Sequence, residues 1–445
     1  METASLDPLP PATVRPPRVL KAIQDRNIWR IYATILLLGM AYGLAVAVVA
    51  IHLDALGYDE RQIGSLAAWF ASGIVALSIP AGKLVNRWGA KRILALALYG
   101  YAFSVSIFPL FTSYYPIAAV RFLDGCCSAC IWIGCETILL RRSDASNKAQ
   151  VTSVYAMAMA IGYVLGPIAA KVIAAILPLK ASFLVSGVIA TVSATFVALR
   201  LEPDAHDLRR AERRRTKAGE APSSAHAEGP PAPILTILKR IKTACFAAFS
   251  YGYFEASVVL FLPLYLMHEK GIAKEETIIV PAFFAAGMLL FTNVAGRLGD
   301  RYGHLFLMRI LATIGGTMTL GFVALRSFAP MAAAVFVAGA TLASISPVSL
   351  ALQGVVTEPH DYDRANAMYN AFYAAGILLG PPLSGLVFAR WGGGTMLVHL
   401  AALWAAFVVF GVVFGRDDPA SSRRVARNGE ADSADVATAR PGGAS

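Results

Sequence analysis

The sequence predicts an all-α membrane protein with twelve transmembrane helices, arranged as two six-helix halves. Three observations support this fold class. The 445 residues are 57% hydrophobic and 15% charged, with a mean hydropathy of +0.59, far more apolar than a soluble domain. Apolar runs of about 20 residues, enough to cross about 30 Å of hydrocarbon, recur along nearly the whole chain. Motifs of the first half also return in the second, which indicates an internal duplication.

Each apolar run is expected to form a helix, because a segment in lipid must satisfy its own backbone hydrogen bonds. Barrel strands would instead need alternating runs of about 10 residues, a pattern that the sequence lacks. The expected helices fall near residues 28–52, 62–84, 92–111, 117–140, 151–177, 180–201, 242–267, 277–298, 305–325, 329–355, 365–388 and 394–415.

The remaining segments define the domain organisation. The first residues are rich in proline and basic side chains and resemble no cleavable signal, so they are expected to stay as a tail. Between the halves, a basic run followed by Ala, Pro, Ser and Gly predicts a flexible linker. The expected units are an N-terminal tail at 1–27, a six-helix half at 28–202, a linker at 203–236, a second half at 237–415 and a C-terminal tail at 416–445.

The net charge of +11 is concentrated in alternate loops. Basic residues are dense before the first apolar run, after the even-numbered runs and in the linker, whereas the other loops carry few. Because positive loops stay in the cytoplasm, both termini and the linker are expected to be cytoplasmic, in a bacterial-type inner membrane. The charge therefore orients the chain and does not call for a nucleic-acid partner.

Four of the five cysteines lie within the fourth apolar run, and Cys127 and Cys130 have the CxxC spacing. A zinc or redox site is disfavoured, because no second pair lies nearby and the setting is an apolar helix. Small residues that pack between helices explain these cysteines better.

One basic loop occurs twice, as GKLVNRWGAKR at Gly82 to Arg92 and as GRLGDRYGHLF at Gly296 to Phe306. The two copies are 214 residues apart, and the same offset aligns positions in four helices without a gap. The matched positions are Gly57 with Gly271, Gly82 with Gly296, Arg87 with Arg301, Gly89 with Gly303, Gly125 with Gly339, Tyr155 with Tyr369, Gly162 with Gly376, Gly166 with Gly380 and Pro167 with Pro381. Since each half has an even number of spans, the copies share one orientation, and a binding cavity is expected at their interface.

These features resemble the major facilitator superfamily over essentially all of residues 28–415. The resemblance is carried by the six-plus-six spans, the basic linker and GxxxxRxG after spans 2 and 8. RFLDG at Arg121 to Gly125 resembles a signature of span 4, and GYVLGPIAA at Gly162 to Ala170 resembles the antiporter signature of span 5. Both are commonest in the drug and metabolite exporters of that superfamily. The chain departs from that branch at Asp124, where an amide is usual, and at the two alanines that replace paired glycines.

Glu255 is the leading candidate for chemistry, because it lies at the centre of the seventh span. A charged group there is costly and usually faces a cavity or a partner, and burial favours the protonated carboxyl. These properties suit a proton carrier. The alternative is a carboxyl that is paired or kept protonated for packing alone.

Arg121 and Asp124 are three residues apart in span 4 and therefore lie on one helical face. They form either a structural ion pair or part of proton and substrate coupling. The resemblance implies a coupling role at Arg121 and implies nothing for Asp124.

A second group of residues is expected to gate the inner face. The resemblance implies that acidic groups near this face pair with the basic loops, although solvated interface carboxylates are the alternative. Asn86 lacks the charge of its counterpart Asp300, which predicts a weaker latch in the first half. The gating candidates are Gly82, Asn86, Arg87, Gly89, Arg92, Glu136, Gly296, Asp300, Arg301, Gly303 and Glu358.

Other candidates line the cavity or pack helices. Aromatic and amide side chains in the spans could contact substrate, although most such groups face lipid or other helices: Tyr42, Trp132, Tyr155, Tyr163, Asn293, Asn370 and Tyr373. The repeated GxxxGP motif allows close helix approach and a kink, through Gly162, Gly166, Pro167, Gly376, Gly380 and Pro381.

The sequence contains no nucleotide-binding motif, metal cluster or nucleophile elbow. We therefore expect neither an enzyme nor a cofactor or metal, and a proton gradient as the energy source. The expected partners are a small-molecule substrate and the bilayer, with no nucleic acid and no obligatory protein partner, and the chain is expected to be a monomer. The resemblance favours proton-coupled export by alternating access. Proton-symport import and a receptor that binds ligand without transport are the alternatives.

Overall fold

The computed structural model describes residues 25–143, 148–202, 233–358, 361–415 and 418. The expected N-terminal tail up to residue 24, the linker from 203 to 232 and nearly all of the C-terminal tail lie outside the described residues. The described chain is helical, and its helices are α1 (Arg26–Ala55), α2 (Glu60–Trp88), α3 (Ala90–Ile107), α4 (Tyr114–Arg142), α5 (Lys148–Ile176), α6 (Lys180–Arg200), α8 (Ile234–His268), α9 (Lys274–Thr277), α10 (Val280–Tyr302), α11 (His304–Phe322), α12 (Phe328–Val356), α13 (Tyr362–Trp391) and α14 (Gly393–Val413).

Within the described residues, eleven helices are long and apolar enough to cross a membrane. The number is twelve when the two bent segments of α2, which contains Pro80, count as one span. The all-α membrane fold is confirmed. Two details differ from the expectation: α8 begins at Ile234, inside the segment expected to be linker, and the four-residue helix α9 precedes α10.

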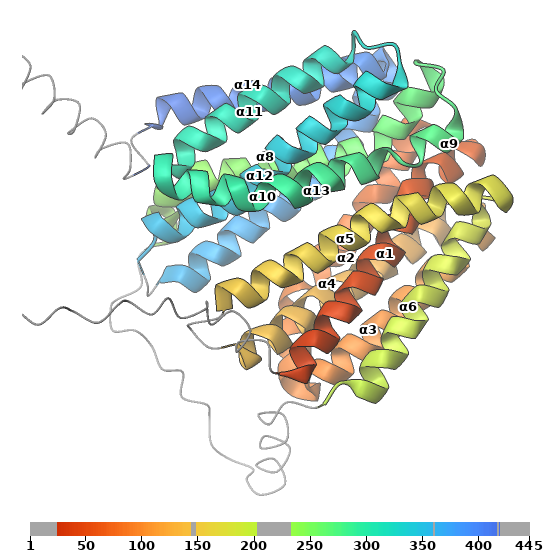
Figure 1. The fold of residues 1–445 in the computed structure, drawn as a ribbon, viewed down its shortest axis with the longest axis horizontal. Coiled ribbons are helices and arrows are strands. Elements are labelled where there is room, and N and C mark those ends of the chain that lie inside the picture. The colour runs from red at the N-terminus through yellow and green to blue at the C-terminus, as the bar shows by residue number, and fades with distance from the viewer. Residues whose placement is uncertain (1–24, 144–147, 203–232, 359–360, 416–417, 419–445) are drawn as a thin grey trace, which may run out of the picture.

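The helices form two bundles, one from α1 to α6 and the other from α8 to α14 (Figure 1). The duplication is visible in matching close contacts. A Cβ on Gly125 of α4 would lie 1.9 Å from the carbonyl oxygen of Phe70 on α2, and one on Gly339 of α12 would lie 2.1 Å from that of Phe284 on α10. Both residues of the second contact are 214 positions after those of the first. Only a glycine permits such backbone approach, which explains why the motif recurs.

The GxxxGP motifs pack the first helix of each half against the fifth. Gly162 and Gly166 of α5 lie against the backbone of α1, and Gly376 and Gly380 of α13 lie against the backbone of α8. A Cβ at any of these positions would come within 2.3 to 2.6 Å of a backbone atom. The inter-helix turns also repeat, because Gly89 and Gly303 both adopt positive φ angles, of 91° and 96°.

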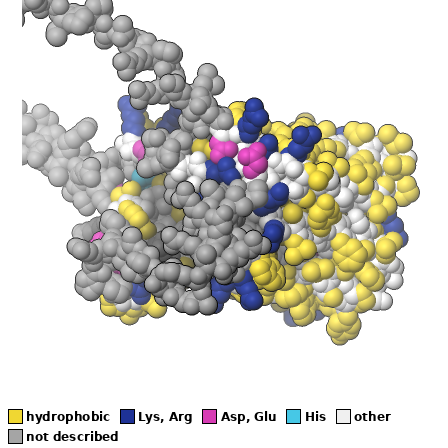
Figure 2. Space-filling model, turned by 90° about the horizontal axis from the view of Figure 1, so that it is seen from below, with side chains coloured by type: hydrophobic (Ala, Val, Ile, Leu, Met, Phe, Trp, Pro, Cys, Tyr) yellow, Lys and Arg dark blue, Asp and Glu magenta, His cyan; other side chains and the backbone are white. Residues whose placement is uncertain are grey.

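We call the end of the molecule where α1 begins and α2 ends the basic end, and the other the opposite end. Lys and Arg side chains gather around the basic end, while much of the remaining surface is hydrophobic (Figure 2). Exposed apolar residues such as Val188 of α6 and Val409 of α14 belong to this surface. Such a surface matches a lipid environment.

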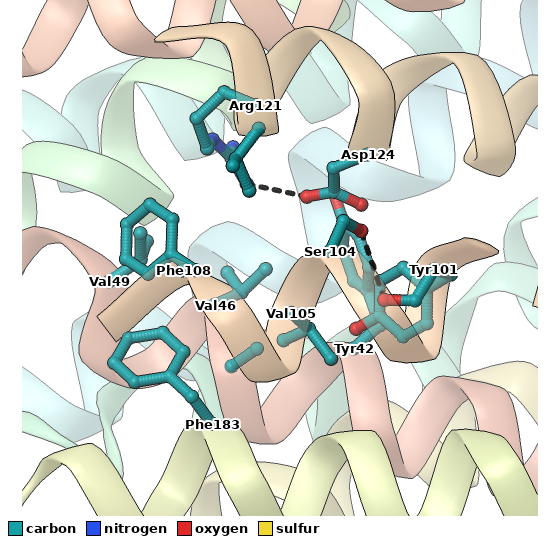
Figure 3. Close-up of a pocket in the computed structure, with 12 residues that line it drawn as sticks. Tyr42, Val46, Val49, Tyr101, Ser104, Val105, Phe108, Arg121, Asp124 and Phe183 are labelled. Atoms are coloured by element: carbon teal, nitrogen blue, oxygen red, sulfur yellow. Dashed lines mark hydrogen bonds and ion pairs between the residues drawn. The ribbon is translucent and has the colours of Figure 1, made fainter. Parts of the chain in front are cut away.

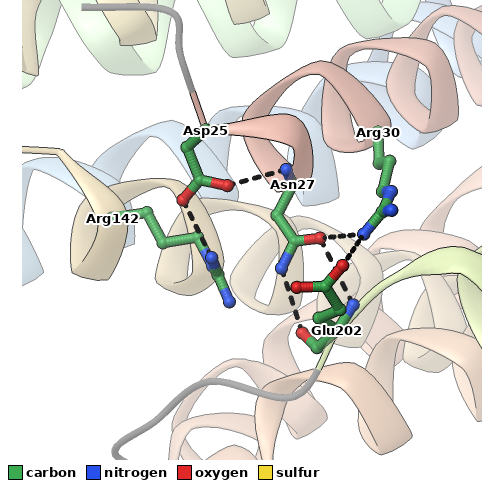
Figure 4. Close-up of polar contacts among 5 residues, drawn as sticks. All are labelled: Asp25, Asn27, Arg30, Arg142 and Glu202. Carbon is green, nitrogen blue, oxygen red and sulfur yellow. Dashed lines mark hydrogen bonds and ion pairs between the residues drawn. The ribbon is translucent and has the colours of Figure 1, made fainter.

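At the basic end, a polar network fixes the start of α1 (Figure 4). Asp25 caps α1 through the backbone amide of Asn27 and accepts a hydrogen bond of 2.8 Å from Arg142 at the end of α4. Arg30 donates to Glu202, which follows α6, at 2.8 Å. This hydrogen bond lowers the pKa of the exposed Glu202 carboxyl. The network ties the ends of three helices of the first half together.

The halves meet at the opposite end. Gly64 near the start of α2 lies against Pro381 of α13, where a Cβ would be 2.4 Å from the proline carbonyl oxygen. Gly385 of α13 lies as close to the carbonyl of Glu60. The bundles converge near α9 and spread toward the basic end (Figure 1). The structure therefore describes a state that is closed at the opposite end.

Candidate functional site

A cavity of about 310 Å³ lies between the two halves. Helices α1, α2, α4 and α5 line one side, and α8, α10 and α13 line the other. Its size matches sites for small organic ligands. A cavity lined by both halves is the arrangement that the parallel repeat predicts.

The cavity wall follows the internal repeat. Many of its residues form pairs that are 214 positions apart: Val46 with Leu260, Ala67 with Pro281, Phe70 with Phe284, Ile74 with Met288, Met159 with Tyr373, Tyr163 with Ile377, and Pro167 with Pro381. The polar groups break this symmetry. Glu255 corresponds to Ala41, and Arg121 corresponds to Val335. The two halves therefore share the positions of their lining residues but contribute different ionisable groups to the cavity.

Glu255 of α8 lines the cavity and is half-buried. The hydroxyl of Tyr373 on α13 donates a hydrogen bond of 3.0 Å to its Oε2 atom. Tyr251, one helical turn earlier on α8, also lines the cavity, and its ring stacks on that of Tyr373 at a centroid distance of 6.1 Å. A hydroxyl donor stabilises a carboxylate without neutralising its charge.

Arg121 faces Glu255 from the first half, and its charge is already neutralised. Its Nη1 atom lies 2.8 Å from Oδ2 of Asp124, which is 6% exposed. The guanidinium also lies over the ring of Phe70, 4.5 Å from the centroid. Figure 3 shows the pair at the edge of a smaller pocket inside the first half. The other oxygen, Oδ1, is buried and has no hydrogen-bond partner among the described residues.

Four of the residues expected to line a cavity do so: Tyr42, Trp132, Tyr163 and Tyr373. Tyr155 lies nearer the start of α5, packed against the hydrophobic core, and Asn293 and Asn370 are exposed. None of these three lines the cavity. Tyr251, Phe70, Phe284, Met159 and Met288 also line it and were missed. Tyr251 could have been found from its spacing of four residues from Glu255, which places both on one helical face.

The gating candidates lie at the basic end, and their partners are mostly within one half. Asn86 accepts a hydrogen bond from Arg141 of α4 at 3.1 Å, and Glu358 lies 2.6 Å from Arg240 of α8. Gly82 and Gly296 face open space, and Glu136 is exposed. Arg87 at the end of α2, Arg92 at the start of α3 and Arg301 at the end of α10 are exposed at this end as well.

The second copy of the basic loop has its own contacts. Asp300 lies 3.2 Å from His304, the first residue of α11, while the guanidinium of Arg301 lies over the ring of Tyr302. The backbone amide of Leu305 in the first turn of α11 donates instead to Asp418, at 3.0 Å. A residue of the C-terminal tail therefore occupies the helix N-terminus where a carboxylate is favoured.

At the opposite end, Asp54 of α1 lies 3.2 Å from His268 of α8. These positions are 214 residues apart and are therefore equivalent in the repeat. Equivalent positions meet only where the pseudo-twofold axis passes between them. The contact therefore marks the axis at the closed end, and it is an ion pair when the imidazole is protonated.

We expect Asp54→Asn to shift the population toward a state open at the opposite end, because it removes the charge on one side of this contact. A partly exposed pair contributes about 0.2 to 1 kcal/mol, so the equilibrium should change by at most about fivefold. The measurement is the distance between spin labels at Arg61 and Ala273, which are exposed beside this end. The exchange Asp54→His with His268→Asp retains the pair and should restore the original distances. Identical distance distributions in all three proteins would show that the pair does not hold this end closed.

The fold and the cavity between its two halves are those of a multi-pass membrane protein of the transporter class. The model of the Major Facilitator Superfamily matches residues 31–244 and 244–440. The chain belongs to this family, whose members are membrane transporters.

Curated relatives agree with this assignment. The chain is 23% identical over 403 residues to an uncharacterized MFS-type transporter of Yersinia pestis (strain Pestoides F), covering 88% of this chain and 97% of the relative. It is 22% identical over 387 residues to the uncharacterized MFS-type transporter YcaD of Escherichia coli O7:K1, covering 85% and 93%.

Solved structures share the fold. A bacterial homolog of the human lysosomal transporter Spinster, in an inward-facing and occupied conformation, has a TM-score of 0.72 at 12% identity, covering 88% of this chain and 96% of that one. The nucleoside transporter NupG has a TM-score of 0.71 at 13% identity, covering 87% and 99%.

Proposed function

We propose that this chain is a proton-coupled exporter of a small organic molecule, working by alternating access in a bacterial-type inner membrane with both termini cytoplasmic. The observation that carries the proposal is a single carboxylate, Glu255, that faces a cavity between two duplicated halves. A carboxyl group in this position can bind a proton or interact with a substrate, and it changes sides when the halves rock about the cavity.

Glu255 is the proposed proton-carrying group, and Arg121 with Asp124 is the second candidate. The basic end, expected to be cytoplasmic, is the end toward which the halves spread, so substrate would enter there. Rearrangement of the contacts at Gly64, Gly385, Asp54 and His268 would then open the cavity to the other side. Protons entering from that side would displace the substrate and reset the carrier.

The proposal is tested by proton flux in proteoliposomes that contain the full chain and an internal pH dye. We expect a pH change when substrates are added from a panel of organic cations, carboxylic acids, nucleosides and lipid analogues, and none in protein-free liposomes. Accumulation in inverted vesicles under an imposed proton gradient would support export. Accumulation in right-side-out vesicles would instead indicate import by symport. Ligand binding without counterflow or proton movement would contradict transport.

A further inference from the structure

The charge of the cavity identifies the kind of molecule that it would bind. Among the described lining residues, Glu255 and Arg121 are the ionisable groups other than the tyrosine hydroxyls. Arg121 is neutralised by Asp124 at 2.8 Å and is covered by the ring of Phe70. Glu255 accepts a hydrogen bond from the neutral hydroxyl of Tyr373, which leaves its negative charge uncompensated. The cavity therefore has a net charge of about −1 when this carboxyl is ionised.

The wall of the cavity is rich in aromatic rings. Seven line it, from both halves: Tyr42, Phe70, Trp132, Tyr163, Tyr251, Phe284 and Tyr373. The face of an aromatic ring carries partial negative charge and attracts organic cations, most strongly in a desolvated site. Met159 and Met288 add polarizable side chains that adapt to ligands of different shape.

An anion would fit this cavity poorly. It would face the unneutralised Glu255, and the pair that Arg121 forms with Asp124 leaves no net positive charge to attract it. A neutral ligand could donate a hydrogen bond to the carboxylate, but it would leave the negative charge uncompensated.

Resting on the proposed function, we infer that the substrates are monovalent organic cations with an apolar or aromatic body. The cationic group lies beside Glu255, and the body lies among the rings. The substrate and a proton then compete for the same carboxylate, so one proton replaces one cation and the exchange is electroneutral.

The groups around Glu255 restrict where this competition can occur. Tyr373 from α13 hydrogen-bonds it, and Tyr251 from its own helix stacks on Tyr373. Tyr42 of α1 and Tyr163 of α5 are close enough to interact with it electrostatically. The paired Arg121 of α4 lies across the cavity. Apart from that neutralised pair, the surrounding groups are phenols, which stay neutral near pH 7. Glu255 is therefore the group whose protonation governs cation binding.

The test is calorimetric titration of the purified full-length protein with benzyltrimethylammonium, 2-phenylethanol and phenylacetate, which represent the cationic, neutral and anionic classes. We expect the cation to bind at least about tenfold more tightly than the other two, a factor equivalent to one charge-assisted contact. Its affinity should fall as the pH is lowered. Equal binding of all three probes, tighter binding of phenylacetate, or no binding of the cation would overturn the inference.

Single substitutions test which residues produce the preference for the cationic probe. Glu255→Gln should weaken cation binding by about tenfold or more and remove its pH dependence. Tyr163→Leu should weaken it by about threefold to tenfold through loss of a ring, whereas Tyr99→Leu, at an exposed tyrosine of α3, should not. If Glu255→Gln does not fold, comparison of Tyr163→Leu with Tyr99→Leu still tests whether the aromatic rings bind the cation. The pH dependence of cation binding by the wild type then tests the role of the carboxylate. Equal loss in both tyrosine variants, or no pH dependence in the wild type, would contradict the inference.

Failure of the substrate-class inference can be distinguished from failure of the proposed transport function. Cation binding without counterflow would leave the cation site in place and refute transport. Proton-coupled transport of other compounds without cation binding would retain the transporter and refute the substrate class.

Discussion

Glu255→Gln is expected to abolish proton-driven transport while leaving the protein folded. Glutamine has nearly the same size and can still accept the hydrogen bond from Tyr373, but it cannot bind and release a proton. Transport under a pH gradient should fall by about a hundredfold or more, as expected for loss of an essential proton-transfer group. Proteoliposomes with an imposed gradient provide the measurement, and thermal unfolding in detergent provides the folding check.

The matched control for this variant is Glu275→Gln. Glu275 lies exposed in α9, away from the cavity. It carries the same chemical change without facing the substrate site, so its transport should equal that of the wild type. Full proton-driven transport by Glu255→Gln would show that another group carries the proton, and Asp124 would be the next residue to replace.

Asp124→Asn is expected to be the most destabilising of the single substitutions considered. It leaves the guanidinium of Arg121, whose side chain is 15% exposed, without its partner at 2.8 Å. Removing one member of a buried pair costs about 3 to 5 kcal/mol. Unfolding in detergent at increasing denaturant should show the loss. The extra positive charge should also weaken cation binding in the cavity.

The double variant Arg121→Gln with Asp124→Asn separates the two roles that the pair could have. It removes both charges together and should recover most of the stability and, because the cavity charge returns to that of the wild type, most of the transport. A stable double variant that no longer moves protons would place the pair in the coupling step. A single Asp124→Asn protein as stable as the wild type would show that the pair contributes little to folding.

The membrane fold could be predicted because its signals are local. Runs of about 20 apolar residues and the offset of 214 residues need no knowledge of distant contacts. Glycine positions such as Gly125 and Gly339 were also visible in the sequence, but the structure explains them, since each lies against a backbone carbonyl of the neighbouring helix. Helix α8 begins earlier than expected from the sequence, because Ile234 to Thr236 directly follow a proline-rich segment and do not belong to a long apolar run.

The candidate site was partly predictable. Glu255 could be identified because a carboxyl in a long apolar run is rare and costly. The tyrosines that surround it could not be separated from other aromatic residues: Tyr155 and Tyr163 lie on the same helix, yet only Tyr163 lines the cavity. Met159 is the first residue of α5 that lines the cavity, and Tyr155 lies one turn before it, so the difference depends on how deep the cavity extends along this helix.

The sequence by itself determined the membrane-spanning nature of the helices, the duplication and the isolated carboxylate, because hydropathy and repetition are properties of the chain alone. Only the tertiary structure decided which side chains share the cavity, that Asp124 neutralises Arg121 within it, and that the equivalent residues Asp54 and His268 meet at the closed end. These relations depend on how two nearly symmetric bundles pack together, and residues that are distant in sequence become neighbours only when that packing is formed.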